Sequence, residues 1–337
     1  MVLLFRKIIL LLLPLIVMLA VYLAFDPFEV VYSYRSHYND TMINYNWDYN
    51  QTETLLRNYS VRRYDSFIFG NSRSSAFLTR DWRRFADSSG MLHYAAMNES
   101  LYGIHRKVLL LSKEHMPVRN ALVILDTQVL SATVNSTGHL FIKHPKVSGE
   151  NSLVFHLTFF REFMDIPFFI GYLDYKLTGK VRPLFRSRFS ERITYDPVTG
   201  DKNLVDREKM IEESPERYYG DKRSVFYPRD LSKEQYSPPV IKEIQIRYLQ
   251  DIKNVFAENR TDYRIVISPL YDMKRLHPAD LATLKDIFGS SRVFDYSGNN
   301  CFTRDVHNYY DGSHFRPRVG REIMGQMYVP SRVISSK

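Results

Sequence analysis

The sequence predicts an α/β fold built on a five-stranded parallel sheet, and three features of the chain support this expectation. Short apolar runs, too brief for helices, end at glycine, proline or a polar residue, as buried parallel strands do. Longer stretches between most of these runs carry apolar residues on one helical face. Strands and helices that alternate on this scale favour a parallel sheet with helices on both faces.

The first 25 residues are predicted to form a transmembrane signal anchor. Arg6 and Lys7 precede an uncharged run of 18 residues, Ile8 to Phe25, which as a helix would span roughly 27 Å. No Ala-x-Ala-like cleavage site follows, so a cleaved signal peptide is the less favoured alternative. The basic residues before the run place the amino terminus in the cytoplasm and the remaining residues outside.

Composition and charge narrow the class of protein. A single cysteine, Cys301, excludes an internal disulfide framework, so an ordinary apolar core must stabilise the fold. The formal net charge of +9 would suit nucleic acid, but the sequence contains no nucleic-acid recognition motif and the topology puts the domain outside the cytoplasm. A membrane surface or an acidic glycopolymer is the favoured partner, with a basic surface that binds nothing as the alternative.

The segment 26–60 is polar and rich in tyrosine, and we expect a stalk there. The first half of the core follows at 61–135, with Thr79 as the N-cap of its first helix. Its elements are expected in the order strand, helix, strand, helix, strand, at residues 65–69, 79–87, 92–97, 101–115 and 121–125.

The second half of the core, residues 240–337, continues the alternation. Pro278 stands in the first turn of a predicted helix, where its missing N–H group costs nothing. The elements are expected in the order helix, strand, helix, strand, helix, at residues 240–256, 263–268, 278–288, 292–295 and 317–328.

The segment 136–239 does not fit the alternation and is predicted to be an insertion. It contains an aromatic stretch, Leu153 to Tyr175, which charged residues and a proline interrupt too often for a membrane span. Six basic residues follow, at positions 176, 180, 182, 186, 188 and 192. The segment is read either as a surface that lies on a membrane or docks a partner, or as a subdomain that packs its aromatic residues internally.

Ser72 is the candidate nucleophile. The apolar run Phe67-Ile68-Phe69 stops at Gly70, and the sequence Asn71-Ser72 follows in a polar turn. A strand that delivers a serine into a turn at the carboxyl edge of a sheet is how α/β enzymes expose a nucleophile beside backbone N–H groups. Taken alone, Gly-Asn-Ser is more often an ordinary strand-to-loop turn.

A second motif near the carboxyl terminus strengthens this interpretation. Asp311 and His314 stand three residues apart in a loop before the last predicted helix. An imidazole takes the proton of a serine well only when a carboxylate orients its other ring nitrogen and stabilises its charge. Parallel strands end at one edge of the sheet, so Ser72 and His314 are expected to meet there.

Together, the serine turn, the Asp-x-x-His ending and the five-strand pattern resemble the SGNH (GDSL-type) hydrolases, over residues 61–135 and 240–330. The resemblance implies a three-layer fold and the catalytic residues Ser72, His314 and Asp311. No cofactor or metal is expected, because the sequence contains no clustered His/Cys ligand set and no phosphate-binding glycine loop. Asn98 followed by Gly103 matches the family's second block and implies Gly103 as an oxyanion-hole donor. The family's third block is absent, and Gln128 stands near its place as a further oxyanion candidate.

The anchor and the missing third block resemble one subset of that superfamily, the membrane-anchored proteins of envelope polymer modification. These include the D-alanyl-lipoteichoic acid transfer protein and relatives of the alginate O-acetyltransferases. The resemblance implies transfer of an acyl group, expected to be acetyl, onto an envelope glycan through an acyl-serine, with a multi-pass membrane-bound O-acyltransferase as partner. An SGNH esterase or deacetylase, and a non-catalytic scaffold for such an acyltransferase, are the alternatives.

The expected location is the outer face of a bacterial inner membrane. Six Asn-x-Ser/Thr sequons raise the question of a eukaryotic glycoprotein. One of them is at Asn98, in the predicted active-site loop, where a glycan would block access. The sequon pattern is therefore better explained by a bacterial protein.

Overall fold

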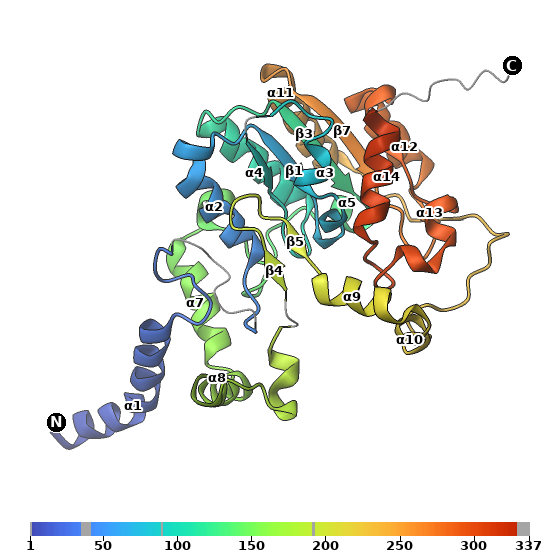
Figure 1. Cartoon of the computed structure of the whole chain (residues 1–337). Helices are drawn as coiled ribbons and strands as arrows, with labels where there is room; N and C mark the ends of the chain where they lie inside the picture. The colour runs from blue at the N-terminus through green and yellow to red at the C-terminus, as the bar shows by residue number, and fades with distance from the viewer. Residues whose placement is uncertain (1, 35–41, 89, 191–192, 329–337) are drawn as a thin grey trace, which may run out of the picture.

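A five-stranded sheet, parallel throughout, forms the centre of the structure, a computed structural model (Figure 1). The structure describes residues 2–34, 42–88, 90–190 and 193–328, without the side chains of Val2, Leu3, Phe5 and Ile8. The strand order is β2-β1-β3-β7-β9, and the bounds are β1 Ser66–Phe69, β2 Met91–His93, β3 Asn120–Leu125, β7 Asp262–Ile267 and β9 Val293–Asp295. The predicted α/β class and the predicted parallel five-stranded sheet are confirmed.

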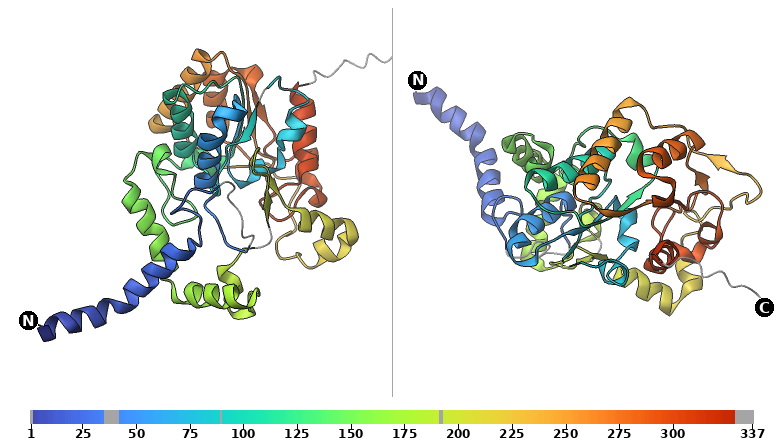
Figure 2. Two further views of the ribbon diagram at one scale, coloured as in Figure 1. Left: turned by 60° about the vertical axis from the view of Figure 1, so that its left-hand side comes forward. Right: turned by 90° about the horizontal axis from the view of Figure 1, so that it is seen from above.

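Alternate residues of the strands face two separate cores. Phe67 and Phe69 of β1 pack into one core, and Ile68 between them packs into the other. The first core is covered by α2 Trp47–Arg62, α4 Leu101–Lys113, α11 Glu243–Glu258 and α12 Pro278–Phe288. The second core is covered by η1 Ser72–Ala76, α3 Thr79–Trp82, α13 Cys301–Arg304 and α14 Pro317–Tyr328 (Figure 2). Both faces of the sheet are therefore buried, which explains the nearly continuous apolar sequence of its strands.

The helix expected over residues 79–87 is the largest error within the core. Only α3, Thr79–Trp82, is α-helical, and Leu78 rather than Thr79 is its N-cap. The hydroxyl of Thr79 donates instead to Asp201 of the insertion at 2.7 Å, and its amide donates to the same carboxylate. The hydroxyl of Thr79 therefore makes a tertiary contact and does not cap the helix as the sequence pattern had predicted.

The segment expected to be a stalk is part of the folded domain wherever the structure describes it. Phe28 and Val30 are buried in a third core with aromatic residues of the insertion. Asn46 donates to the carbonyl oxygens of His139 and Ile142, both at 2.8 Å, and so attaches this segment to the insertion. The prediction of a stalk was wrong for these residues, and residues 35–41 lie outside the described part of the chain.

The amino-terminal helix is α1, Val2–Phe25 (Figure 1). Within the described part of the chain, no helix is found that is both long and apolar enough to cross a membrane. The run from Ile8 to Phe25, predicted to be the anchor, lies within α1.

The predicted insertion, residues 136–239, contains short helices and a hairpin beside the carboxyl edge of the sheet (Figure 1). It also contains the short strand β6, Gln235–Tyr236, which pairs in parallel with β8, Lys274–Arg275. Its helical elements are α6 Pro145–Ser148, α7 Ser152–Phe163, α8 Ile166–Thr178, η2 Pro183–Arg188, α9 Val205–Glu213 and α10 Pro215–Gly220. The hairpin pairs β4, Thr194–Tyr195, with β5, Lys202–Asn203. The aromatic residues of α7 and α8 are largely packed inside the protein, as the second of the two sequence interpretations proposed.

Candidate active site

Local backbone geometry presents Ser72 at the end of β1. Gly70 has φ +158°, and a Cβ atom there would lie 2.9 Å from Cβ of Ser74 and 3.0 Å from Cβ of Ile124. Asn71 then caps η1 by accepting a hydrogen bond from the amide of Arg73 at 3.0 Å. Ser72 is the first residue of η1, so its side chain and its amide lie at the carboxyl edge of the sheet.

His314 and Asp311 lie beside Ser72, although 239 residues separate Ser72 from Asp311 in the sequence. Oγ of Ser72 is 2.8 Å from Nε2 of His314. Nδ1 of His314 is 2.9 Å from Oδ1 of Asp311 and 3.0 Å from its Oδ2. The predicted geometry of the three side chains is confirmed.

The carboxylate of Asp311 is held in its charged form. Burial alone would raise the pKa of Asp311, but the hydrogen bond and charge of His314 and the amides of Ser313 and His314 lower this pKa well below its ordinary value. Arg207 of α9 adds an ion pair to Oδ2 at 3.1 Å. Asp311 is therefore ionised throughout the neutral range and able to keep a proton on Nδ1 of His314.

The insertion also fixes the loop that carries the Asp-His pair. Glu208 of α9 accepts hydrogen bonds from the hydroxyl of Tyr310 and from the guanidinium of Arg316. The hydroxyl of Tyr218, on α10, donates to the carbonyl oxygen of Tyr310 at 2.8 Å. These contacts from outside the core were not predicted, because no local pattern links α9 to a loop about 100 residues away.

A carboxylate on the neighbouring strand secures the serine turn. Asp126, directly after β3, accepts hydrogen bonds from Nδ2 of Asn71 at 2.9 Å and from Arg73 at 2.6 Å. The same residue caps the short helix α5, Thr127–Ser131, through the amide of Val129. Asparagine at position 71 thus has a structural use, because its side-chain amide can donate to Asp126.

Ser72 opens into a cavity of about 310 Å³ that includes both sequence-predicted and unpredicted residues. Gln128 lines this cavity, as expected, and its Nε2 donates to Oδ1 of Asn98. Asn98 has φ +50°, a left-handed conformation that is uncommon outside glycine and typical of functional loops. Nδ2 of Asn98 and the amide of Ser72 have no hydrogen-bond acceptor among the described residues.

Gly103 does not meet the expectation that it donates to an oxyanion. Its amide donates to Oγ of Ser100, the N-cap of α4, at 3.0 Å, and Gly103 is not among the residues lining the Ser72 cavity. A Cβ atom at this position would collide with the carboxylate of Glu99. Glycine is therefore required here by a buried ionic cluster, and the predicted role of Gly103 does not fit this geometry.

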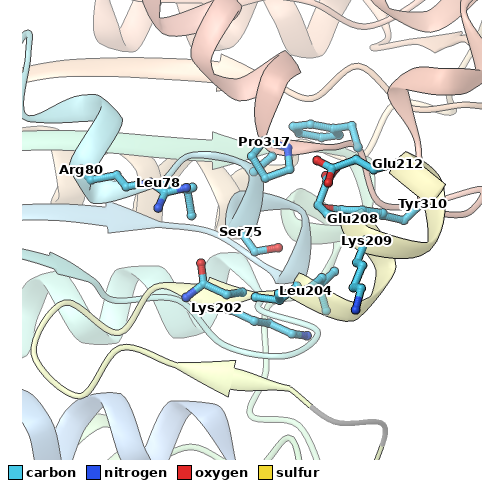
Figure 3. A pocket seen from close by; sticks show the side chains of 14 residues that line it. Ser75, Leu78, Arg80, Lys202, Leu204, Glu208, Lys209, Glu212, Tyr310 and Pro317 are labelled. Carbon is cyan, nitrogen blue, oxygen red and sulfur yellow. The ribbon is translucent and has the colours of Figure 1, made fainter.

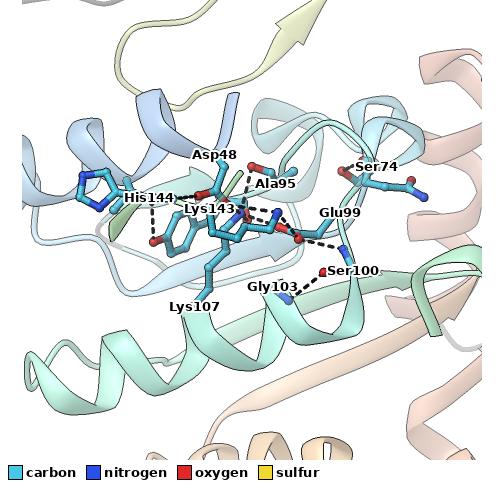
Figure 4. A network of polar contacts seen from close by, with 12 residues as sticks. Asp48, Ser74, Ala95, Glu99, Ser100, Gly103, Lys107, Lys143 and His144 are labelled. Atoms are coloured by element: carbon cyan, nitrogen blue, oxygen red, sulfur yellow. Dashed lines mark hydrogen bonds and ion pairs between the residues drawn. The ribbon is translucent and has the colours of Figure 1, made fainter. Parts of the chain in front are cut away.

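The buried ionic cluster consists of two acidic and two basic side chains: Asp48, Glu99, Lys107 and Lys143 (Figure 4). Nζ of Lys107 is 2.6 Å from Glu99 and 2.9 Å from Asp48, and Nζ of Lys143 is 2.6 Å from Glu99. All four side chains are at most 1% exposed. Because Glu99 directly follows Asn98, the cluster also positions the loop that lines the Ser72 cavity.

A larger cavity of about 390 Å³ adjoins the site on the side of the insertion (Figure 3). Lys202 lines both cavities, so the two share a wall. One side of the larger cavity is apolar and includes Leu78 and Pro317, and the rim carries Arg80 and Lys209. This cavity leads away from the Ser72 site between the core and α9.

A second Ser-His-Asp arrangement exists but is sealed from solvent. Oγ of Ser74 is 2.8 Å from Nε2 of His93, and Nδ1 of His93 is 3.2 Å from Asp201. Ser74 and His93 are fully buried, and neither lines a cavity described above. This set fastens the insertion to the core, because Asp201 belongs to the insertion and Ser74 and His93 belong to the core. Among the described residues, no cluster of three His, Cys, Asp or Glu side chains could hold a metal ion.

Comparison with known proteins does not identify the chain. No family model matches the sequence, and no curated protein matches it at a significant level. The function must therefore be argued from the geometry and chemistry of the site itself.

Proposed function

We propose that this protein is an SGNH-type serine acyltransferase that transfers an acyl group, such as acetyl, to a hydroxyl of a cell-envelope polysaccharide. The observation that carries the proposal is the contact of Ser72 with His314 and of His314 with Asp311 at the open carboxyl edge of the sheet. These distances are those of a nucleophile, its general base and the group that orients the base.

In the proposed first step, Oγ of Ser72 bonds to the carbonyl carbon of an ester or thioester donor while Nε2 of His314 takes the hydroxyl proton. The tetrahedral intermediate then releases its leaving oxygen or sulfur, which takes the proton from Nε2, and the acyl group stays on Ser72. An acceptor hydroxyl next gives its proton to Nε2 and attacks the acyl carbon, and Ser72 recovers the proton. Asp311 stabilises the imidazolium in both steps.

The negative oxygen of the intermediate is held by the amide of Ser72 and by Nδ2 of Asn98. Both donors face no acceptor among the described residues, and the side chain of Asn98 lies at the Ser72 cavity. Gln128 acts through Asn98, because its donation to Oδ1 turns Nδ2 away from Gln128. In this proposal Gln128 is a positioning residue, and Asn98 replaces the donor that the resemblance assigned to Gly103.

An Asn98→Asp variant is expected to lower kcat for ester cleavage by about 10²–10³-fold, as loss of one oxyanion donor does. Aspartate keeps the size and tolerates the left-handed backbone but has no N–H group to donate. Steady-state hydrolysis of 4-nitrophenyl acetate measures the effect, and Gln128→Ala should cost less, about tenfold, because its action is indirect. An Asn98→Asp enzyme with unchanged kcat would exclude Asn98 from the oxyanion hole.

The adjoining cavity is the proposed place of the acceptor. An apolar wall suits the C–H face of a sugar ring, and Lys202, Asn203 and Arg80 can donate hydrogen bonds to its hydroxyl groups. Lys202 stands at the junction with the Ser72 cavity, so a ring bound in the larger cavity lies close to an acyl-serine.

The test of this function uses 4-nitrophenyl acetate as donor and, as acceptor, the envelope polysaccharide freed of ester groups by mild base. Wild-type protein is expected to form acetyl-Ser72, found by mass spectrometry, and to pass the acetyl group to the polysaccharide. Val205→Trp places an indole at an exposed position in the acceptor cavity and should lower transfer about tenfold or more, since losing 1.4 kcal/mol of binding has that effect. In the same variant, the rate of 4-nitrophenyl acetate hydrolysis without acceptor should stay within about twofold of the wild-type rate.

Val61→Trp is the matched control, since Val61 is an exposed valine on α2 that lines neither cavity. Acetate release that is indifferent to polysaccharide would identify an esterase or deacetylase instead. If the wild-type protein forms no acetyl-Ser72 but still binds a membrane acyltransferase, the scaffold alternative would be favoured.

The proposed location is the outer face of the inner membrane, with α1 as a single-pass anchor and a multi-pass O-acyltransferase as the source of the acyl group. The uncharged sequence from Ile8 to Phe25 supports the anchor, and so do its unburied leucines, of which Leu11 is 79% exposed. The partner is inferred from the resemblance to envelope-modifying proteins alone.

A further inference from the structure

The segment from α7 to η2, Ser152–Arg188, has an unusual division of its apolar residues. Its aromatic side chains are mostly inside, and Phe159 and Phe163 are fully buried. Most of its aliphatic side chains are outside, and Leu177 and Leu184 are 87% and 83% exposed. We call the exposed aliphatic set the aliphatic platform, and its residues are Leu153, Val154, Leu157, Ile166, Ile170, Leu177 and Leu184.

Helical spacing gathers the platform residues into continuous faces. On α8, Ile166, Ile170 and Leu177 follow each other by four and seven residues and so lie on one side of the helix. Phe168 and Tyr172 occupy the opposite, buried side. An outward apolar face on this scale marks an interaction surface, because single exposed leucines are common on soluble proteins but ordered arrays are not.

Basic side chains flank the exposed leucines, Leu177 and Leu184, in the sequence. Lys176, Lys180 and Arg186 are exposed, and Arg182 and Arg188 are exposed while paired with Asp174 and Asp165, at 2.8 Å and 3.3 Å. Arg192 lies outside the described residues. Aliphatic residues flanked by lysine and arginine suit the boundary between acyl chains and anionic headgroups, where long basic side chains extend toward phosphate.

The platform is joined to the end of α1. Tyr22 is 2% exposed, and its ring centroid is 5.4 Å from those of Phe160 and Phe163 of α7. Asp26 stops α1 and fixes the turn that follows, by accepting hydrogen bonds from the amides of Val30, Val31 and Tyr32. Figure 2 shows α8 close to the point where α1 leaves the body of the protein.

We propose that the aliphatic platform inserts into the headgroup layer of the membrane that α1 crosses, so that the domain rests on the bilayer through α8 and η2. The occupant is lipid, because the platform continues the apolar surface of α1 and carries the positive charge that anionic lipid attracts. The inference rests on α1 being a membrane anchor, as proposed above, and is independent of the chemistry at Ser72. It assigns the membrane contact to aliphatic residues and not to the phenylalanines.

The test places a fluorescent label at single cysteines of the full chain in lipid nanodiscs whose acyl chains carry a nitroxide quencher. Cys301→Ser removes the native thiol, which is exposed. Labels are then attached through Leu184→Cys in the platform, Leu11→Cys in α1 and Val61→Cys on α2, all exposed positions. We expect severalfold quenching at positions 184 and 11, none at 61, and stronger quenching at 184 when phosphatidylglycerol is present.

The outcomes separate the two proposals. Quenching at 11 but not at 184 would overturn the platform and leave the anchor standing, and no quenching at either would overturn the anchor. Quenching at 184 only in native membranes, and not in lipid alone, would contradict the lipid assignment and point to a protein partner.

A second variant tests the platform without relying on one label. Leu177→Glu with Leu184→Glu should abolish quenching of a label at Ile170→Cys while hydrolysis of 4-nitrophenyl acetate in detergent is unchanged. Unchanged quenching in this variant would also contradict the proposal.

Discussion

A Ser72→Ala variant is expected to lose ester turnover by about 10⁴-fold or more, because alanine has no hydroxyl to form the acyl ester and the remaining donors only stabilise charge. Oγ of Ser72 is 2.8 Å from Nε2 of His314, a distance at which proton transfer needs no rearrangement. The loss should appear in kcat for 4-nitrophenyl acetate, with an unchanged unfolding temperature, because the side chain is only partly buried.

A fluorophosphonate probe provides the covalent readout for the same variant. The probe should label wild-type protein at Ser72 and should leave Ser72→Ala unlabelled. Ser232→Ala, which changes an exposed serine outside both cavities, should be labelled and active like wild type. Full turnover in Ser72→Ala, or a label on another serine, would refute the acyl-serine mechanism.

Sequence alone could predict the sheet and the meeting of Ser72 with His314, because each depends on short-range chemistry plus one topological rule. Five apolar runs too short for helices gave the strands, and parallel strands end at a common edge. In the Asp-x-x-His loop, the short spacing by itself allows Asp311 to orient His314. This contact can therefore be predicted without knowledge of the fold. Nothing else had to be known to place these side chains together.

The role of Gly103 was mispredicted because the prediction relied on its spacing from Asn98 and neglected the N-cap serine at position 100. Ser100 stands directly before the helix that starts at Leu101, and an N-cap serine takes the amide of the third helical residue, which is Gly103. That pattern was readable in the sequence. The contribution of Lys202 and Arg207 to the site was not, because the insertion contacts the core through tertiary packing without sequence periodicity.

The stalk was mispredicted for a related reason. A polar, tyrosine-rich segment resembles a solvated linker when hydrogen-bond partners are unknown. Asn46 and Gln51 are fully buried, and their amides bond to carbonyl oxygens 93 to 149 residues away. Polar composition therefore does not distinguish an exposed segment from one whose polar groups are satisfied inside the protein.

A Lys107→Met variant is expected to lower the free energy of unfolding by about 3–5 kcal/mol, the usual cost of removing one partner from a buried ion pair. Without Lys107, the carboxylates of Asp48 and Glu99 would share Lys143 alone, with no access to water. Urea unfolding of the full chain in detergent measures the loss. Lys113→Met, at the exposed end of the same helix, should change stability by no more than about 0.5 kcal/mol.

The pH dependence of this loss tests its electrostatic origin. Burial alone would raise the pKa of Asp48, but Lys107, Lys143 and the amide of His144 lower it from 3.8 to about 2. A lowered pKa stabilises the fold at pH values above about 4, and that contribution disappears as the pH falls toward 2. In Lys107→Met the carboxylate of Asp48 loses a positive charge that lowers its pKa and so binds a proton more readily. The difference in stability from wild type should therefore narrow as the pH falls from 7 to about 4. A deficit that is constant over this range would instead indicate that Lys107 stabilises the protein by packing, through its stem and its contact with the ring of Tyr94.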